Sequence, residues 1–339
     1  MSENAIDLVL AELKNSVAQY YPEHGEARSV RVVGHTPKND HYIYDVVVDF
    51  VSHSERVAAK VYRPGKCGSQ DARGMACREF ENLHHIYNLF QKRKLTGVPR
   101  PLGDFTRAGA VLAEKFGGLP LQSIIMKAAL LPGYAEQGTL ELAARKTGEW
   151  LRSFHRATAN LPVPFDPGSL QQELEKLCNN CKGEGLDDHA IRTILHGTSL
   201  ILSRSRKNLP CSAVLNDFTP LNVIVGEQGI GICDYARMTT PGTSFYDVAQ
   251  FMAAVEALEK YPFCNRIITA RVQEQFLSAY SVNAADEAIL RVFKMRALLG
   301  MFAQGRGVKE SALRKKVMWA TVMKRFIQQA AQRSLAPAA

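Results

Sequence analysis

Two neighbouring stretches decide how this sequence is interpreted: AVLNDFTPLNVIV at Ala213–Val225 and GIGICDYARM at Gly229–Met238. The apolar runs within them, at residues 223–225 and 230–233, predict two short strands. The four residues between these strands (GEQG) have the composition of a turn. The sequence therefore predicts a β-hairpin that is preceded by a polar loop.

Three side chains with oxygen ligands flank this hairpin. Asp217 and Asn222 lie on the loop that leads into the first strand, and Asp234 ends the second strand. Because the turn folds the chain back, we expect the two strand ends to open on the same side. Carboxylates suit Mg²⁺, which proteins bind together with substrate phosphates, and a further carboxylate can accept a proton from an attacking hydroxyl. Polar residues are also common at hairpin ends without any catalytic role, so the spacing alone leaves both interpretations open.

The first third of the chain predicts a small antiparallel sheet with one long helix. Three β-rich runs at 28–34, 42–51 and 56–62 follow a short N-terminal helix and are joined by polar turns, which indicates a meander. Residues 75–92 have helical spacing of their apolar side chains, and 110–116 reads as a further strand.

Beyond Gly117-Gly118, a natural hinge, the sequence reads as mostly helical apart from the hairpin. The expected helical segments are 136–158, 169–206, 244–282 and 285–335. We therefore expect an α+β fold of two lobes. Residues 1–116 form a β-rich N-terminal lobe, and residues 117–339 form a larger, mainly helical lobe that makes a cleft with it.

Lys60 stands between two apolar residues in a run that is typical of a buried strand. Burying an unpaired ammonium is very costly, so this lysine needs an anionic partner. Glu79, in the first turns of the next helix, can supply one. A lone strand lysine is most often an exposed edge residue. The full series in this order, a strand Lys, a helix Glu and then Asp, Asn and Asp, is much less likely to arise by chance than a strand lysine alone.

With these residues in view, the chain resembles the aminoglycoside phosphotransferase/choline kinase branch of the protein-kinase-like superfamily. The motifs occur in the family's order and span about residues 30–255. They are VAAK (57–60), REFENL (78–83), TGEWLRSFHRA (147–157), NDFTPLN (216–222), ICDYA (232–236) and SFYDVAQF (244–251).

The resemblance implies a protein-kinase-like bilobal fold and a role for each matched residue. Lys60 would hold the α- and β-phosphates of ATP and be oriented by Glu79. Asp217 would be the catalytic base, and Asn222 and Asp234 would bind Mg²⁺. Positioning and charge neutralisation are what phosphoryl transfer needs, and these residues supply both.

Further positions follow from the same resemblance, and two features depart from it. Glu114 and Phe116, at the strand end Glu114–Phe116, would contact the adenine. Asp247 would hold the catalytic loop in place through the backbone of that loop. The family's His-Gly-Asp is replaced by Leu215-Asn216-Asp217, and the first β-turn is not glycine-rich. A catalytically weak pseudokinase scaffold therefore stays open as an alternative.

The composition fits a globular protein of the cytoplasm. The chain has 339 residues, 46% of them hydrophobic, which excludes a disordered or collagen-like chain. Seven scattered cysteines favour reduced thiols, and Cys178-x-x-Cys181 lacks a second ligand pair for zinc. No run approaches the ~18 apolar residues of a membrane span, and acids interrupt the N-terminal apolar stretch, unlike a signal peptide.

The net charge of +9 is concentrated at the C-terminal end. Residues 291–339 hold eleven Lys and Arg residues and one acid, so they carry +10, while the other 290 residues sum to −1. Residues 311–335 predict an amphipathic helix with basic clusters beside apolar positions such as Ile327 and Ala330. It is either a core-packed helix with a solvated basic face or a surface for an anionic substrate or the inner face of a membrane. Nucleic acid is not an expected partner, because no nucleic-acid-binding motif is present.

This charge distribution bears on the acceptor. Aminoglycosides are polycations and need clustered carboxylates. A basic lobe therefore argues against an aminoglycoside or a choline-like cation, unless the acids of segment 169–190 line its cleft. We therefore expect a neutral or anionic hydroxyl acceptor, a sugar or a glycan carried on an anionic lipid. An aminoglycoside-modifying phosphotransferase remains the alternative enzyme.

Overall fold

The computed structural model describes residues 2–67, 71–131, 137–183, 185–205, 208–261, 263–304, 322 and 324–335. The chain divides into two compact units. The first unit comprises Met1–Gly118 and Ile224–Met238, and the second comprises Leu119–Val223 and Thr239–Ala339.

The first unit is built on a four-stranded antiparallel sheet in the order β1-β2-β3-β4. Its elements are α1 (Ser2–Tyr20), β1 (Ser29–Pro37), β2 (His41–Asp49), β3 (Ser54–Tyr62), α2 (Ala72–Lys92), η1 (Thr106–Ala108), β4 (Ala110–Glu114), β8 (Val223–Gly226, from Ile224 on) and β9 (Gly229–Ile232). The predicted meander, the long helix and the hairpin are confirmed. The N-terminal helix has 19 residues and is longer than expected.

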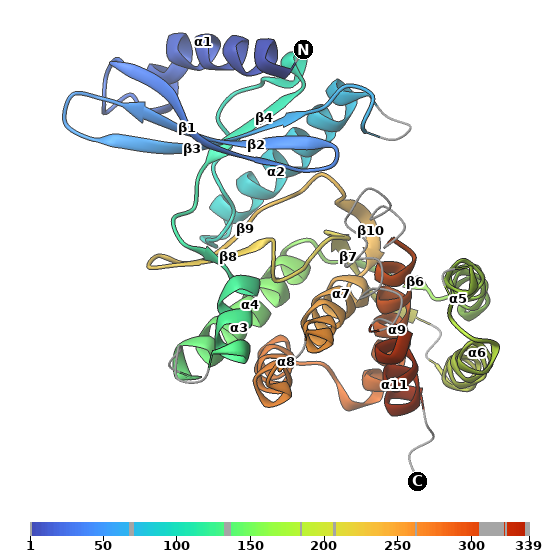
Figure 1. Ribbon diagram of the computed structural model, residues 1–339. Coiled ribbons are helices and arrows are strands. Elements are labelled where there is room, and N and C mark those ends of the chain that lie inside the picture. The colour runs from blue at the N-terminus through green and yellow to red at the C-terminus, as the bar shows by residue number, and fades with distance from the viewer. Residues whose placement is uncertain are drawn as a thin grey trace. The chain divides into compact units, whose positions relative to one another are not determined.

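The two faces of this sheet pack against different helices, as Figure 1 shows for α1 and α2. Along β3, Val57, Ala59 and Val61 are buried in an apolar core shared with α1. Because side chains alternate along a strand, Lys60 and Tyr62 point to the opposite face, toward α2. The alternation of side chains along β3 thus points Lys60 toward α2, the helix that carries Glu79.

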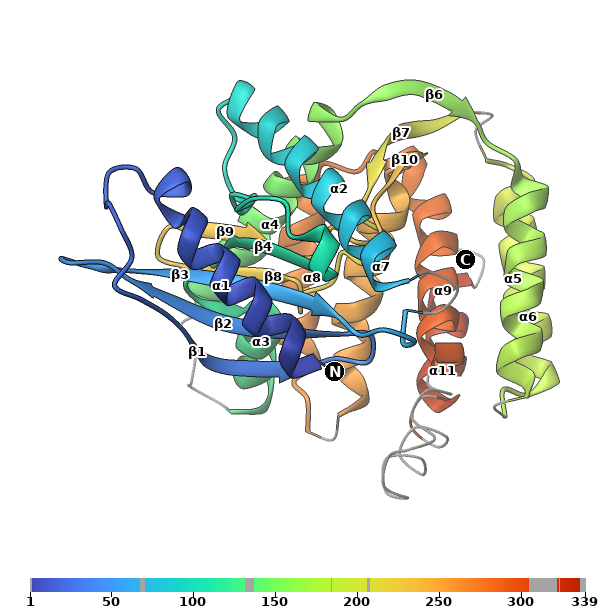
Figure 2. The same ribbon diagram turned by 90° about the horizontal axis from the view of Figure 1, so that it is seen from above.

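The second unit is mainly helical. Its elements are β5 (Leu119–Pro120), α3 (Leu121–Leu130), α4 (Gln137–Ala157), β6 (Asn160–Pro164), α5 (Pro167–Lys182), α6 (Asp188–Leu202), β7 (Asn208–Val214), β10 (Thr239–Thr243), α7 (Phe245–Glu256), η2 (Ala257–Lys260), α8 (Arg266–Tyr280), η3 (Ala284–Asp286), α9 (Glu287–Gln304) and α11 (Lys324–Leu335). Within it, α5 and α6 lie side by side, as Figure 2 shows.

One expectation about this part of the chain is wrong. The hairpin is not the only β-structure after Gly118, because β6, β7 and β10 form a three-stranded antiparallel sheet in the order β10-β7-β6. All three strands contain proline, and β10 also contains glycine, residues that normally signal turns and loops. Their pairing is set by contacts far apart in sequence, such as Gly242 with Ser212.

The hairpin lies in the first unit, whereas the sequence division at residue 116 assigned it to the second lobe. Its contacts explain this: the Ile232 N–H donates to the Gly97 carbonyl (2.9 Å), and the Asn82 amide donates to the Tyr235 carbonyl (2.9 Å). The structural boundary at Gly118 falls two residues after the expected one.

The predicted helix at 311–335 falls mostly outside the described residues. Within α11, Ile327 and Ala330 are fully buried, as their apolar spacing predicted. Half of the basic residues of that segment (Arg314, Lys315 and Lys316) lie in 305–321, which the structure does not describe, as do several of its apolar positions. In the described part of the chain, no helix is long and apolar enough to cross a membrane.

Helices α4 and α8 approach closely at Gly148. A Cβ added there would lie 2.4 Å from the Phe276 carbonyl oxygen and 3.1 Å from the Ala279 Cβ. A Cβ added at Gly138, on the same helix, would meet nothing within 4 Å. These two glycines therefore make a matched pair that isolates the effect of helix contact.

We expect Gly148→Ala to lower the free energy of unfolding by about 1–3 kcal/mol, because the contact with α8 must open. Gly138→Ala should be neutral or stabilising by up to about 1 kcal/mol, since it only restricts the unfolded chain. Urea unfolding followed by circular dichroism measures both. Equal effects of the two substitutions would contradict the close packing at Gly148.

Candidate active site

A lysine in the first unit contacts two carboxylates that are far apart in sequence. Lys60 Nζ lies 3.0 Å from Glu79 Oε1 and 3.1 Å from Asp234 Oδ1. These residues come from β3, α2 and the segment after β9, and together we call them the Lys60 cluster. The Lys60 side chain is 13% exposed, Glu79 is 6% exposed and Asp234 is 25% exposed. The ammonium thus has the anionic partners that its burial requires, and Asp234 is the most accessible member.

Lys60 and Asp234 each stabilise the charged form of the other. Burial disfavours the charged form of Lys60, but the carboxylates of Glu79 and Asp234 outweigh it and hold the Lys60 pKa well above its usual value. Burial likewise opposes ionisation of Asp234, and the Lys60 ammonium more than offsets it, so the Asp234 pKa lies below its usual value. At neutral pH the cluster therefore presents a fixed ammonium beside an ionised carboxylate.

Glu79 is held at both of its oxygens. The Tyr62 hydroxyl donates to Oε2 at 2.6 Å, and the Tyr235 N–H approaches Oε1 at 3.4 Å. Burial raises the pKa of Glu79, and the nearby Asp234 charge adds to the effect. Sequence reasoning missed Tyr62. Its spacing of two residues from Lys60, which places both side chains on one face of β3, is the signal that could have found it.

Asp234 has a left-handed backbone conformation, which glycine adopts more readily than aspartate. Its φ is +81°, in the left-handed region that non-glycine residues seldom adopt. The Ala236 N–H donates to Oδ1 at 3.2 Å, and the Asn82 side-chain amide donates to the carbonyls of Tyr235 (2.9 Å) and Met238 (3.4 Å). These bonds hold the segment after β9 and aim its carboxylate at Lys60.

The strand end proposed for the adenine packs tightly on the hairpin. A Cβ on Gly231 would lie 2.2 Å from the Phe116 ring, and one on Gly118 would lie 2.2 Å from the Val225 carbonyl oxygen. Glycine is thus required at both positions for the chain to approach this closely. The Glu114 carboxylate is paired with Arg100, at 2.9 Å from Nε.

In the second unit, Asp247 organises the loop that carries Asp217. Its buried carboxylate accepts hydrogen bonds from the N–H groups of Leu215 (2.8 Å) and Asn216 (2.9 Å). His155 Nε2 lies 3.1 Å from the same carboxylate, and His155 Nδ1 lies 2.8 Å from the Tyr280 hydroxyl. The predicted bracing by Asp247 is confirmed, and His155 is a buried hydrogen-bonded residue. Tyr280 was not found from the sequence.

Asp217 and Asn222 lie together on this loop. The Asn222 side-chain N–H donates to the Asp217 carbonyl at 2.9 Å, which closes the loop on itself. Next to Asp217, the buried Phe218 ring anchors the loop by packing near Trp150 and Phe251, with centroid distances of 6.2 and 5.7 Å. Both polar side chains of the loop are partly exposed.

Comparison with known proteins rests on structure. No family model matches the chain, and no curated protein matches its sequence. A choline kinase from Cryptosporidium parvum is 13% identical, with a TM-score of 0.62, and the match covers 98% of each chain. A glucosamine kinase in complex with glucosamine, ADP and inorganic phosphate is 14% identical, with a TM-score of 0.51, covering 94% of this chain and 97% of that one. An aminoglycoside phosphotransferase from Alicyclobacillus acidocaldarius is 15% identical, with a TM-score of 0.50, covering 89% and 92%.

The chain has the protein-kinase-like fold of choline kinases and aminoglycoside phosphotransferases. The resemblance that the motifs indicated is therefore confirmed by the fold, as is the predicted α+β class.

Within this kinase-like fold, the departure at Leu215-Asn216 is accommodated. Asn216 has φ +61°, a conformation that glycine adopts freely and asparagine tolerates better than most residues. Its side-chain amide donates to Thr239 Oγ1 at 2.9 Å. Leu215 is buried, and its N–H is the donor to Asp247. The changed loop thus keeps its bond to Asp247.

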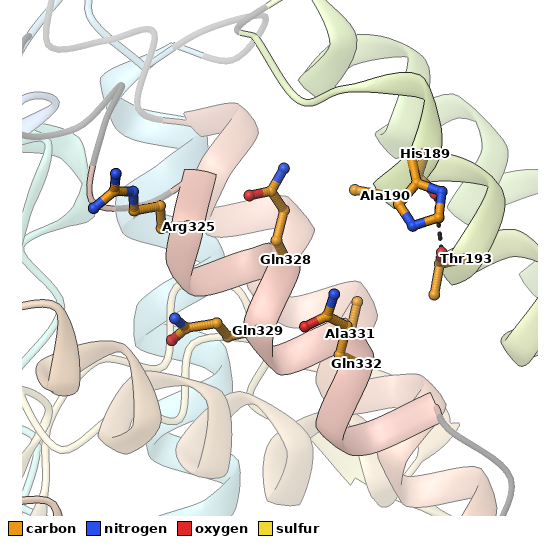
Figure 3. A pocket seen from close by; sticks show the side chains of 8 residues that line it. All are labelled: His189, Ala190, Thr193, Arg325, Gln328, Gln329, Ala331 and Gln332. Atoms are coloured by element: carbon orange, nitrogen blue, oxygen red, sulfur yellow. Dashed lines mark hydrogen bonds between the residues drawn. The ribbon is translucent and has the colours of Figure 1, made fainter.

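The second unit has a polar hollow of about 380 Å³, and none of the candidate active-site residues lines it. It lies between α6 and α11, where Gln328 and Gln332 face His189 and Thr193 (Figure 3). No carboxylate is among the described residues that line it. It therefore lacks the acid groups that the proposed chemistry needs.

Proposed function

We propose that this protein is an ATP- and Mg²⁺-dependent phosphotransferase that moves the γ-phosphoryl group to a hydroxyl of a small molecule. The observation that carries the proposal is the Lys60 ammonium, largely buried and held 3.0 Å from Glu79 and 3.1 Å from Asp234. A purely structural ion pair would need one carboxylate. Two carboxylates leave one, Asp234, able to turn to a cation when phosphate oxygens take its place beside Lys60.

In this proposal Lys60 binds the α- and β-phosphates, and Glu79 orients it. Glu79 suits this task because the Tyr62 hydroxyl fixes its other oxygen. A positioned ammonium stabilises the charge on the phosphates at no cost of reorganisation during the reaction. Glu114 and Phe116 mark the strand end that would receive the adenine.

The donor set fits a magnesium ion. Asp234 offers a carboxylate, and because Asn222 uses its N–H toward the Asp217 carbonyl, its oxygen remains for a ligand. Mg²⁺ bound by Asn222 and Asp234 would neutralise charge on the phosphates. Asp217 would accept the proton of the acceptor hydroxyl or orient that hydroxyl for attack.

We propose a neutral or anionic acceptor, a sugar or a glycan on an anionic lipid. Three of the acids of segment 169–190 that might have bound a polycation have partners within the second unit. Glu173 lies 2.5 Å from Arg296, Asp188 lies 2.7 Å from Lys182, and Asp187 accepts from the Ala190 N–H at 2.8 Å. These three partners reduce the negative charge that the segment could offer to an aminoglycoside.

The basic C-terminal segment also gains partners. Lys294 lies 2.6 Å from Glu256, so this lysine and Arg296 are neutralised inside the second unit. The surplus positive charge therefore rests mainly on the residues after α9, which hold eight of the eleven Lys and Arg residues of 291–339. Contact with an anionic membrane surface through that part of the chain stays a prediction.

The experiment is turnover of ATP by the full chain with a panel of acceptors: sugars, amino sugars, a lipid-linked glycan, choline and aminoglycosides. Formation of ADP together with a phosphorylated product supports the proposal. Faster turnover of aminoglycosides than of any sugar would favour the alternative enzyme. Nucleotide binding without turnover of any acceptor would favour the pseudokinase scaffold.

We expect Lys60→Ala to lower kcat/KM for ATP by about 10²-fold, the typical cost of removing one preorganised charge donor. The matched control is Arg31→Ala, which removes a cation from an exposed ion pair with Asp49 on the same sheet. Coupled measurement of ADP release compares the two. If both variants lose the same activity, Lys60 has no special role.

A further inference from the structure

Two histidines and a glutamate meet at the end of the first unit's sheet, on the face opposite to Lys60. His24 follows α1, His53 lies in the turn between β2 and β3, and Glu55 lies near the start of β3. One ligand atom from each falls within 4.8 Å of the other two. We call these residues the His24 cluster.

The individual distances suit a metal ion. His24 Nε2 lies 3.7 Å from Glu55 Oε1, and His53 Nε2 lies 3.9 Å from the same oxygen. Ligand atoms around a tetrahedral ion with bonds of about 2.1 Å are about 3.4 Å apart. All three ligand atoms lie within 4.8 Å of one another, and the His24 and His53 ring centroids are 3.7 Å apart. Binding a common ion would therefore require the two rings to separate and the ligand atoms to move by up to about 1 Å.

One nitrogen of the cluster has no hydrogen-bond partner. His53 Nε2 is buried and makes no hydrogen bond. The other ring nitrogen, Nδ1, lies 3.1 Å from the Ser52 hydroxyl. In the tautomer whose Nδ1–H donates a hydrogen bond to the Ser52 hydroxyl, Nε2 carries a lone pair that can bind a metal ion. This is the arrangement of metal-binding histidines, whose second nitrogen is fixed by a hydrogen bond.

The surroundings hold the rings in place. The His53 ring stacks on Phe50 at 5.1 Å, and the His24 ring lies 5.3 Å from Phe50 and 5.9 Å from Tyr21. All three cluster side chains are partly accessible, with 24%, 30% and 36% exposure for His24, His53 and Glu55. A site that is both rigid and reachable from solvent can exchange its ion.

We propose that His24, His53 and Glu55 bind a divalent transition-metal ion of the Zn²⁺ class. Two imidazoles and one carboxylate leave a fourth position for water or for Glu23, whose carboxylate lies 3.4 Å from His24 Nε2. The ion would join the chain after α1 to the β2–β3 turn and would stabilise the first unit. It is separate from the proposed nucleotide site, since Glu55 and Lys60 are five residues apart on β3 and face opposite sides.

The test is titration of the metal-free full chain with Zn²⁺, followed by calorimetry and thermal unfolding. We expect one ion per chain and a rise in Tm of about 5 °C or more at one hundred times the Kd. His53→Ala and the isosteric Glu55→Gln should each weaken binding at least about 10-fold. The control variant His84→Ala/His85→Ala, on exposed positions of α2, should bind like the original chain.

Co²⁺ distinguishes the ligands. A Co²⁺ complex of the His24 cluster should show ligand-field bands without the thiolate charge-transfer bands that a cysteine site gives. Three results would each overturn the proposal: no Zn²⁺ binding by the original chain, unchanged affinity in both cluster variants, or thiolate bands with Co²⁺. The cluster would then be a set of imidazole–carboxylate contacts without a metal ion.

Discussion

Asp217→Asn should reduce kcat by about 10²–10⁴-fold and leave KM for ATP within a few-fold. A carboxamide has nearly the same shape as the carboxylate, but it cannot accept the proton of the acceptor hydroxyl. The loop should keep its conformation, because its bonds to Asp247 and Asn222 use backbone atoms around Asp217 and not its carboxylate. Steady-state kinetics with the best acceptor of the panel gives both constants.

The control for this variant is Asp188→Asn, which removes an exposed carboxylate from the same unit. Its kcat should be unchanged. Undiminished phosphoryl transfer by Asp217→Asn would refute the proposed role of Asp217, while leaving the fold and the Lys60 cluster as described.

Asp247→Ala should destabilise the second unit by about 3–5 kcal/mol, because it leaves several buried groups unpaired at once. The N–H groups of Leu215 and Asn216 lose their acceptor, and His155 loses one of its two partners. Activity should fall as well, since these bonds hold the loop that carries Asp217. Urea unfolding measures the change in free energy.

Tyr280→Phe provides the graded comparison. It removes only the hydroxyl that lies 2.8 Å from His155 Nδ1, and its expected cost is about 1 kcal/mol. The two variants should therefore differ severalfold in effect. If Asp247→Ala costs no more than Tyr280→Phe, Asp247 does not organise the loop.

Much of the first unit could be predicted because its signals are local. The alternation along β3, the polar turns and the helical spacing of α2 each act over a few residues. The pairing of Lys60 with Glu79 followed from one strong rule, that a buried ammonium needs an anion. Asp234 could be placed near them only through the resemblance, because 174 residues separate it from Lys60.

The second unit shows where local signals fail. Strands β6, β7 and β10 carry prolines that read as turns, and only long-range pairing makes them a sheet. Tyr62 and Tyr280 contact Glu79 and His155 through their hydroxyls. The spacing of Tyr62 from Lys60 is a local signal, whereas 125 residues separate Tyr280 from His155, and no local pattern joins them. The resemblance supplied the order of the proposed catalytic residues, and the structure supplied the groups that contact them.

The first unit is formed by two chain segments that are separate in sequence, and this limits which gene fragments can encode it. A fragment that ends at Gly118 contains Lys60 and Glu79 but lacks Asp234 and the hairpin on which Phe116 packs. The shortest continuous reading frame that contains the whole first unit runs to Met238 and includes residues 119–223. Expressing the sheet half by itself therefore calls for an artificial linker that splices the hairpin onto Gly118.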